Sequence, residues 1–243
     1  MLEILIVVIG IFIGLQVDDW NERRKEQRLA DAYHERLLED VRTELATLDL
    51  RIEYYAQVRQ HGENVLRGLL GSQNDLGEPF LIDLYQATQI RDYREASDTY
   101  DELISAGALN LIPDTRLRSV LARYYRETQA MIPYWRIQAE YRELVRQHMP
   151  TDIQSRTRTA CEMWSQSEAE LGVTRLASEC SPELSNDDVQ RALTLIFDSP
   201  TFGVEKLFIA ANRLVADLDL KIVIFERKKA SAIRLIDIME GTS

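Results

Sequence analysis

The sequence predicts an all-α protein: an N-terminal transmembrane helix continuing into a long stalk helix, followed by an antiparallel coiled-coil or helical-bundle body. Three observations favour this fold class. Glycine (10) and proline (6) are scarce among 243 residues, while 45% are hydrophobic and 28% charged, a balance typical of helices that bury a core. Residues 2–17 form an apolar run. Two long segments then repeat apolar residues at steps of three and four, as amphipathic helices do.

The anchor is predicted over residues 1–20, because between residues 2 and 17 the only strongly polar side chains are Glu3 and Gln16. A helix over residues 2–17 spans about 24 Å, which is shorter than the ~30 Å hydrocarbon core of a bilayer. A buried core helix is therefore the alternative, and an anchor would need residues upstream or a locally thinned bilayer. A cleaved signal peptide is disfavoured, because a basic start and a small-residue cleavage site are missing.

Two further features of this stretch concern its partners. Gly10 and Gly14 lie four residues apart, a spacing typical of transmembrane helices that pack closely, so they predict self-association of the anchors. The next residues are expected at the membrane interface, where aromatic and basic side chains are enriched. This group comprises Asp18, Asp19, Trp20, Arg23, Arg24 and Lys25. The expected partners are thus the lipid bilayer and further copies of the chain.

The stalk helix is predicted over residues 21–71 and its partner within residues 187–243. The stalk seam is assigned to Leu38, Val41, Leu45, Leu48, Ile52 and Tyr55. The seam of the last helix is assigned to Val204, Phe208, Ala211, Val215, Leu218, Ile222, Phe225, Lys229, Ala232, Ile236 and Met239, of which only Lys229 is polar. Neither helix can bury its stripe alone, so we expect the two to pair antiparallel.

A helical hairpin body is predicted over residues 72–150. Ser97 and Asp114 are expected to cap helix N-termini, and Gly107 is expected to end a helix in a left-handed conformation. Residues 151–186 are expected to be irregular, because they are rich in Ser, Thr and Glu.

Two signals on membrane sidedness conflict. Cys161 and Cys180, 19 positions apart, predict a disulfide and hence an oxidising compartment. Basic residues after the anchor, with none before it, instead favour a body in the cytoplasm. We expect a single-pass protein of the inner (cytoplasmic) membrane with an extracytoplasmic body, an expectation that depends on what precedes Met1.

Charge and motif content exclude several function classes. The net charge of −11 argues against nucleic acid as a partner, because binding to phosphates requires clustered positive charge. The three histidines have no spacing that suits a metal, and neither a glycine-rich phosphate loop nor a Gly-x-Ser-x-Gly motif is present. We therefore expect no catalytic residue, no metal, no cofactor and no enzymatic activity.

The stretch from Glu3 to Arg24 combines a Glu, an apolar run with glycine, Leu-Gln and then Trp-Asn-Glu. It resembles the opening of a family of uncharacterised bacterial single-pass membrane proteins. A second match is the stretch from Thr99 to Ile112, followed by Leu117, Leu121, Tyr124 and Tyr125. Members usually carry a short basic segment before the apolar run, which this sequence lacks. The resemblance implies a membrane-anchored helical body and no known activity.

The first functional hypothesis is a homo-oligomeric membrane assembly, channel-like or pore-forming, in which Asp18 and Asp19 form acidic rings that favour cations. The alternative is a non-conducting envelope scaffold that binds another envelope protein. The anchor offers only its glycines and Gln16 to line a pore, so a closed bundle is equally compatible with the sequence.

Overall fold

A computed structural model describes the backbone of the chain except at residues 1, 92, 94, 136–139, 164–174, 178, 201 and 242–243. Side chains are additionally not described at residues 2–9, 74, 130–135 and 162–163. The chain forms two compact units. Unit 1 comprises residues 1–44, 95–126 and 232–243, and unit 2 comprises residues 45–94 and 127–231.

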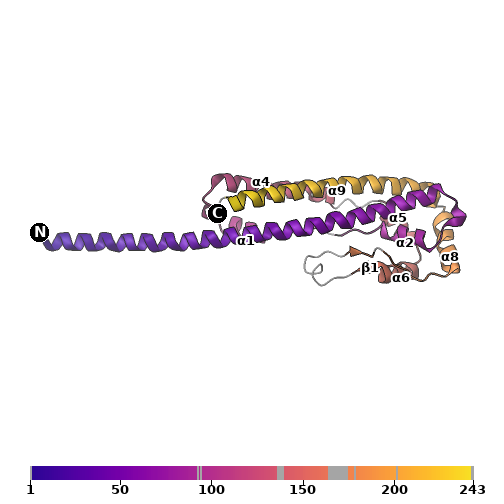
Figure 1. Cartoon of the computed structure of the whole chain (residues 1–243), viewed down its shortest axis with the longest axis horizontal. Helices are drawn as coiled ribbons and strands as arrows, with labels where there is room; N and C mark the ends of the chain where they lie inside the picture. Colours follow the sequence, from indigo (N-terminus) through magenta and orange to yellow (C-terminus); the bar gives the residue numbers. More distant parts are fainter. Residues whose placement is uncertain are drawn as a thin grey trace. The chain divides into compact units, whose positions relative to one another are not determined.

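The described backbone is almost entirely helical, which confirms the predicted all-α class (Figure 1). The α-helices are α1 (Leu2–Leu70), α2 (Glu78–Gln86), α3 (Asp98–Ser105), α4 (Thr115–Trp135), α5 (Glu140–His148), α6 (Thr151–Cys161), α8 (Asn186–Phe197) and α9 (Gly203–Gly241). Short 3₁₀ turns lie at η1 (Gln73–Asp75) and η2 (Leu109–Leu111). Strands β1 (Glu162–Met163) and β2 (Arg175–Leu176) pair antiparallel, with Glu162 opposite Leu176.

Helices α1 and α9 pack antiparallel, as predicted. In unit 2, Lys229 Nζ lies 2.7 Å from an Asp49 carboxylate oxygen, whereas further along α1 the Arg59 guanidinium meets Asp219. Between these pairs the Tyr55 and Phe225 rings stack, with centroids 5.7 Å apart. In unit 1, Arg42 and Glu240 form the corresponding ion pair at 2.7 Å. Residue numbers therefore rise along α1 as they fall along α9.

The predicted seams are only half right. Buried positions of α1 follow the heptad spacing at Tyr33, Leu37, Val41, Glu44, Leu48, Arg51, Tyr55, Val58, Val65 and Leu69. The predicted Leu38, Leu45 and Ile52 are half-buried neighbours of the true seam positions. The reason is chemical: two of the true positions carry charges, Glu44 and Arg51, so a search for apolar residues selects the next residue instead.

Helix α9 shows the same displacement. Its buried seam positions are Leu207, Ala211, Leu214, Leu218, Lys221, Phe225, Lys228, Ala232, Leu235 and Met239, and Ala210 and Ile224 beside the seam are buried as well. Lys229 was predicted on the seam, but it is partly exposed at the edge, where it pairs with Asp49. The buried lysines of the seam are instead Lys221 and Lys228.

Two glycines let elements of unit 2 approach α1 closely. A Cβ built on Gly62 would lie 3.1 Å from Val215 Cγ2 of α9. A Cβ on Gly68 would lie 2.7 Å from the Phe80 ring of α2, which is closer than carbon atoms pack. Because glycine has no Cβ at these two positions, α9 and α2 can pack directly against α1 there.

The hairpin in unit 1 has the predicted ends, with one difference. Gly107 adopts φ 63°, the left-handed conformation expected after α3. Asp114 Oδ1 accepts a hydrogen bond from the Arg116 amide at 2.7 Å and caps α4. Ser97 lies at the N-cap of α3, but its hydroxyl bonds the Asp101 carboxylate instead of a backbone amide, because that acceptor lies one turn away.

Residues 151–186 are more regular than predicted, because α6 occupies 151–161. Serine and threonine favour turns when their hydroxyls compete for backbone groups. In α6 the Thr157 and Thr159 hydroxyls instead donate to the carbonyls of Ile153 and Ser155, one helical turn earlier. The remainder of the predicted irregular segment includes residues 164–174 and 178, which lie outside the described residues.

Candidate functional site

The apolar start of α1 is exposed over the residues whose side chains the structure describes. Residues 10–29 are exposed, and a Cβ on Gly10 or Gly14 would meet no atom within 4 Å. Within the part of the chain that the structure describes, none of the helices combines the length and the apolarity needed to cross a bilayer. The side chains of residues 1–9, about half of the predicted anchor, lie outside that part.

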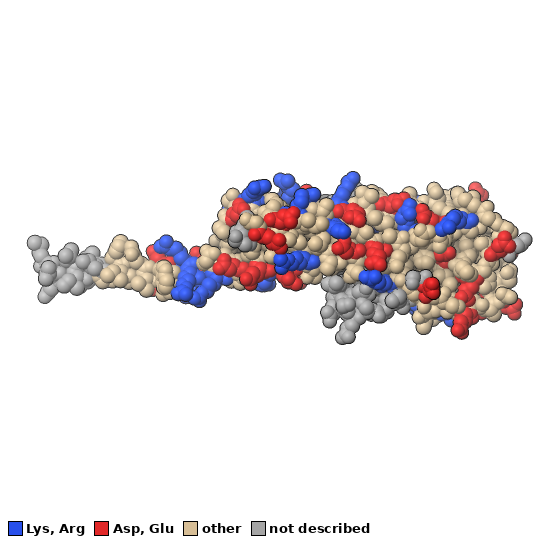
Figure 2. All heavy atoms as spheres, in the orientation of Figure 1, with Lys and Arg blue, Asp and Glu red and all other residues tan. Residues whose placement is uncertain are grey.

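The predicted interface residues follow on the next two turns of α1. The Arg24 guanidinium lies 5.3 Å from the centre of the Trp20 ring, and Arg23 Nε donates to the Asp19 carbonyl at 3.3 Å. Asp18 and Lys25 are exposed on the same turns. Figure 2 shows Lys and Arg side chains gathered on α1 directly after the apolar segment. The structure therefore brings the six predicted interface residues into one exposed collar, residues 18–25.

A buried cationic layer lies inside unit 2, and the sequence did not predict it. Arg51 and Lys221 are each 4% exposed, and Lys221 Nζ lies 4.5 Å from the centre of the Tyr55 ring. Burial lowers the pKa of Lys221 to about 8, the nearby Asp217 carboxylate acts in the opposite direction, and Arg51 lowers it further. Two turns along, the buried Lys228 donates to the Thr128 hydroxyl. Charged side chains at seam positions favour one register over others, so this layer aligns α9 on α1.

Unit 1 contains a buried carboxylate that holds the hairpin. Glu44, 1% exposed, accepts a hydrogen bond from the Ala96 amide at 3.2 Å. Asp40, one turn earlier, accepts from the Thr99 amide in the first turn of α3 at 3.1 Å. Burial raises the pKa of the neighbouring Tyr124 and Tyr125 hydroxyls, and Glu44 adds to both shifts. These carboxylates therefore tie the start of α3 to α1.

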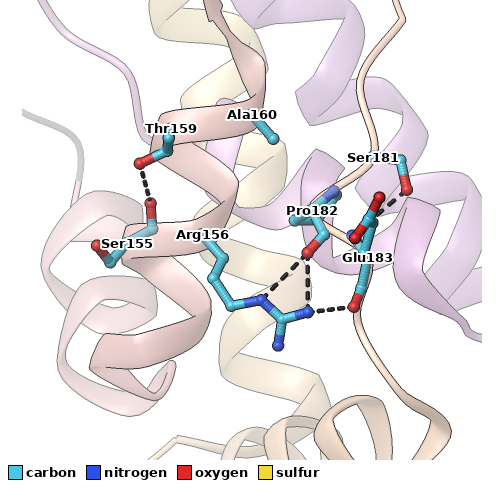
Figure 3. A pocket seen from close by; sticks show the side chains of 7 residues that line it. All are labelled: Ser155, Arg156, Thr159, Ala160, Ser181, Pro182 and Glu183. Atoms are coloured by element: carbon cyan, nitrogen blue, oxygen red, sulfur yellow. Dashed lines mark hydrogen bonds between the residues drawn. The ribbon is translucent and has the colours of Figure 1, made fainter.

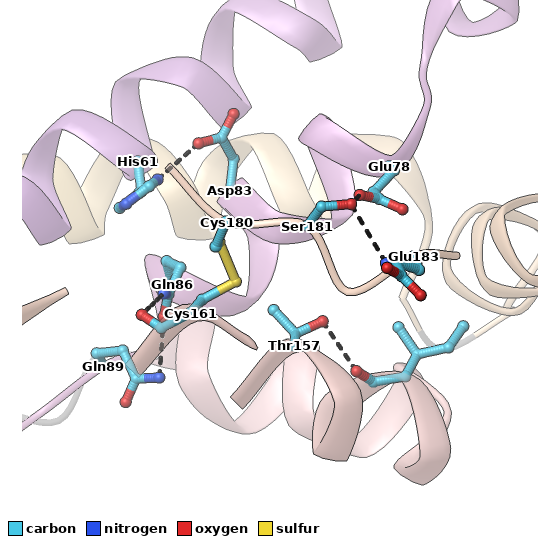
Figure 4. Close-up of a disulfide and its surroundings, with 11 residues drawn as sticks. His61, Glu78, Asp83, Gln86, Gln89, Thr157, Cys161, Cys180, Ser181 and Glu183 are labelled. Atoms are coloured by element: carbon cyan, nitrogen blue, oxygen red, sulfur yellow. Dashed lines mark hydrogen bonds and ion pairs between the residues drawn. A yellow bond between two sulfur atoms is a disulfide. The ribbon is translucent and has the colours of Figure 1, made fainter. Parts of the chain in front are cut away.

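The two cysteines lie in unit 2, Cys161 at the end of α6 and Cys180 in the segment before α8. Cys161 and Cys180 are joined by a disulfide with an S–S distance of 2.10 Å (Figure 4). Gln86 of α2 donates to the Cys161 carbonyl at 3.1 Å, and the next residue after the bridge, Ser181, donates to Glu78 at 2.8 Å. The disulfide and these two bonds attach the segment before α8 to α2 and α6.

An open hollow beside the disulfide is lined by Ser155, Arg156, Thr159, Ala160, Ser181, Pro182 and Glu183 (Figure 3). The Arg156 guanidinium crosses it and donates to the carbonyls of Pro182 and Glu183 and, at 3.0 Å, to Asp188. These bonds hold Glu183 at φ 54°. Because the chain itself uses the guanidinium, this arginine is a structural clamp and not an anion site.

Asp188 makes the clamp sensitive to acid. Hydrogen bonds from Ser185, then the Arg156 and Arg191 guanidiniums, lower the pKa of Asp188 to about 2, below the ~3.9 of an unfolded aspartate. A carboxyl with a depressed folded pKa adds stability above its unfolded pKa, and that stability is lost as pH falls from about 4 to about 2. Asp188→Asn should flatten the pH dependence of the unfolding free energy in this window.

Denaturant unfolding at pH 7, 4 and 2 checks this prediction. Asp187→Asn is the matched control, because Asp187 is the exposed neighbour in the same first turn of α8. Equal flattening in both variants would show that the acid sensitivity does not come from the clamp.

Comparison with known proteins identifies one family, over the first part of the chain. A model described as "Family of unknown function (DUF6090)" matches residues 3–135. The chain belongs to this family. The matched region contains α1 from residue 3 onwards, the collar and the hairpin helices α3 and α4, and it excludes both cysteines. No curated protein and no solved structure matches the chain. Membership in this family confirms the predicted resemblance to an uncharacterised family, and the family's description assigns no function.

Proposed function

We propose that this DUF6090 protein is a membrane-tethered helical module that assembles as a homo-oligomer. The observation that carries the proposal is the exposed apolar surface of residues 10–17. Ile11, Phe12, Ile13, Leu15 and Val17 are 49–62% exposed, and they lie on all sides of the helix. A helix that is apolar all round requires an apolar environment. Lipid supplies that environment on every side at once, whereas a single protein partner covers one side.

The glycines support self-association of such a tether. With no atom within 4 Å of a Cβ built at Gly10 or Gly14, this face is open to another helix. Small residues four apart allow backbones to approach closely in lipid, where packing and not the hydrophobic effect drives association. An anchor from a second copy presents the same glycine face, so a symmetric contact forms without any further partner.

A non-conducting scaffold has more support than a channel. A water-filled pore requires a polar lining, and between residues 10 and 17 the only strongly polar side chain is Gln16. The acidic rings of Asp18 and Asp19 would then lie at the surface of a closed bundle. Ion flux through proteoliposomes separates the two forms, since a conducting assembly passes cations and a scaffold passes none.

The proposed location is the inner membrane, with the body outside the cytoplasm. The disulfide Cys161–Cys180 supports this side, because disulfides persist in oxidising compartments. The basic collar supports the opposite side through the positive-inside bias. Labelling of an engineered surface cysteine with a membrane-impermeant reagent in intact cells tests the sidedness directly.

The test of assembly is the mass of the full chain in detergent and in lipid nanodiscs. The expected result is an oligomer that Gly14→Leu reduces to monomers, because the leucine side chain separates the glycine faces. Phe12→Leu is the matched control, since residue 12 lies about 180° from the glycine face at 100° per residue. A monomeric unmutated chain contradicts the homo-oligomer, and an unchanged oligomer in Gly14→Leu rejects the glycine contact.

A further inference from the structure

We propose that unit 1 contains a binding site for a small amphipathic amine, a molecule with an apolar body and one ammonium group. The site is a cavity between α1, just beyond the collar, and the η2 turn with the start of α4. It is independent of the proposed membrane tether, because every residue that lines it lies between positions 27 and 117. All of them also lie within the family-matched residues 3–135.

The size and the walls of the cavity suit a small organic molecule. Its volume is about 550 Å³, within the roughly 300–1,000 Å³ of small-molecule sites. Its walls are mainly apolar, with side chains of Ala30, Leu37, Leu38, Leu111, Ile112, Pro113 and Leu117. Such walls gain free energy when an apolar body displaces water from them. The lining therefore indicates a ligand with an apolar body.

The charged residues at the cavity determine the sign of the charge that a ligand carries. Its lining includes three carboxylates, Asp31, Glu35 and Asp114, and neither Lys nor Arg. Asp114 uses Oδ1 to accept the Arg116 amide, and Asp31 Oδ1 accepts from Gln27 at 2.9 Å. Each carboxylate has a second oxygen for a further donor. A cation is therefore attracted, and fatty acids or phosphate compounds are repelled.

His34 lines the same cavity, beside the carboxylates. Its Nε2 is buried and has no hydrogen-bond partner among the described residues. The ammonium group of a ligand would donate its N–H groups to the carboxylate oxygens, which balance its charge, so the His34 ring reports on an occupant of the cavity. Apolar walls and carboxylates without a basic residue together specify an amphipathic amine.

Nuclear magnetic resonance of the full chain labelled at its histidines tests the proposal. The chain has three histidines, so His34 is observed beside His61 and His148 as internal controls. The probes are octylamine, octanol and octanoate, which share the same alkyl chain length. We expect octylamine to shift the His34 ring signals saturably, octanol to bind at least about tenfold more weakly, and octanoate to leave them unchanged. Equal responses to octanoate and octylamine would overturn the proposal.

Two variants locate the site. Ala30→Phe fills the cavity and retains its carboxylates, so octylamine binding should be lost. Glu35→Gln retains the shape and removes one charge, so binding should weaken about tenfold. Ala46→Phe, at an exposed position of the same helix, is the control for added bulk and should bind as the unmutated chain does. Undiminished octylamine binding in Glu35→Gln, or in a folded Ala30→Phe protein, contradicts the site.

Discussion

Replacement of Lys221 by methionine is expected to raise the free energy of unfolding by about 2 kcal/mol at pH 7. Burial beside Arg51 lowers the pKa of Lys221 from 10.5 to about 8. Each pKa unit corresponds to about 1.4 kcal/mol, so the charged lysine destabilises the folded state by ~3 kcal/mol. The lost contact with the Tyr55 ring subtracts about 1 kcal/mol. Methionine fills similar space without a charge.

The same substitution should change the pH dependence of stability. The folded pKa of Lys221 lies below the unfolded value, so the destabilisation is fully present below pH 8 and is relieved as pH rises towards 10.5. Buried tyrosines oppose this trend above about pH 10, because burial raises the pKa of Tyr124, Tyr125 and Tyr141. The comparison of variant with unmutated chain between pH 7 and 10 isolates the lysine.

Urea unfolding across this pH range measures both effects. Lys206→Met is the matched control, because Lys206 is exposed on the same helix. A destabilised Lys221→Met protein would show that the buried lysine contributes net stability through its neighbours, contrary to this account.

Removal of the disulfide should produce the largest loss of stability. The bridge closes a loop of 19 residues, and a loop of this length contributes about 3 kcal/mol by restricting the unfolded chain. Cys161 is also fully buried, so serine at that position places a hydroxyl in an apolar site. The double variant Cys161→Ser/Cys180→Ser should therefore unfold at a lower urea concentration, with a free energy of unfolding that is lower by about 3 kcal/mol.

Reductant provides the control for this prediction. The unmutated chain with dithiothreitol should approach the double variant, and the double variant should not respond to dithiothreitol. An unmutated chain whose stability is independent of reductant would show that the bridge does not form under those conditions.

The sequence was sufficient to predict the helices, but not to predict which side chains are buried inside the bundle. On α9, one set of seam positions repeats every seven residues and is entirely apolar: Ala211, Leu218, Phe225, Ala232 and Met239. The helical period of α9 and its antiparallel pairing with α1 were therefore predictable. The intervening positions include Lys221 and Lys228, and hydropathy assigns charged residues to the surface. Their burial depends on contacts with residues far apart in sequence, such as Thr128 with Lys228.

The candidate sites likewise differ in whether the sequence could predict them. The collar and the glycine pair occupy neighbouring turns of one helix, so spacing alone brings them together. The cavity beside His34 forms only when residues 111–117 fold over residues 27–38, and no local pattern in either segment indicates it. His34 was visible in the sequence as a histidine of the stalk helix, but the burial of its Nε2 was not.

The most direct test of the membrane tether is alkaline carbonate extraction of membranes from cells that produce the full chain. Carbonate removes peripheral proteins and leaves proteins that are inserted in the bilayer. We expect the chain to remain in the membrane pellet, because the apolar residues at the start of α1 are exposed on all sides and require lipid. Recovery of the chain in the carbonate supernatant would contradict the account.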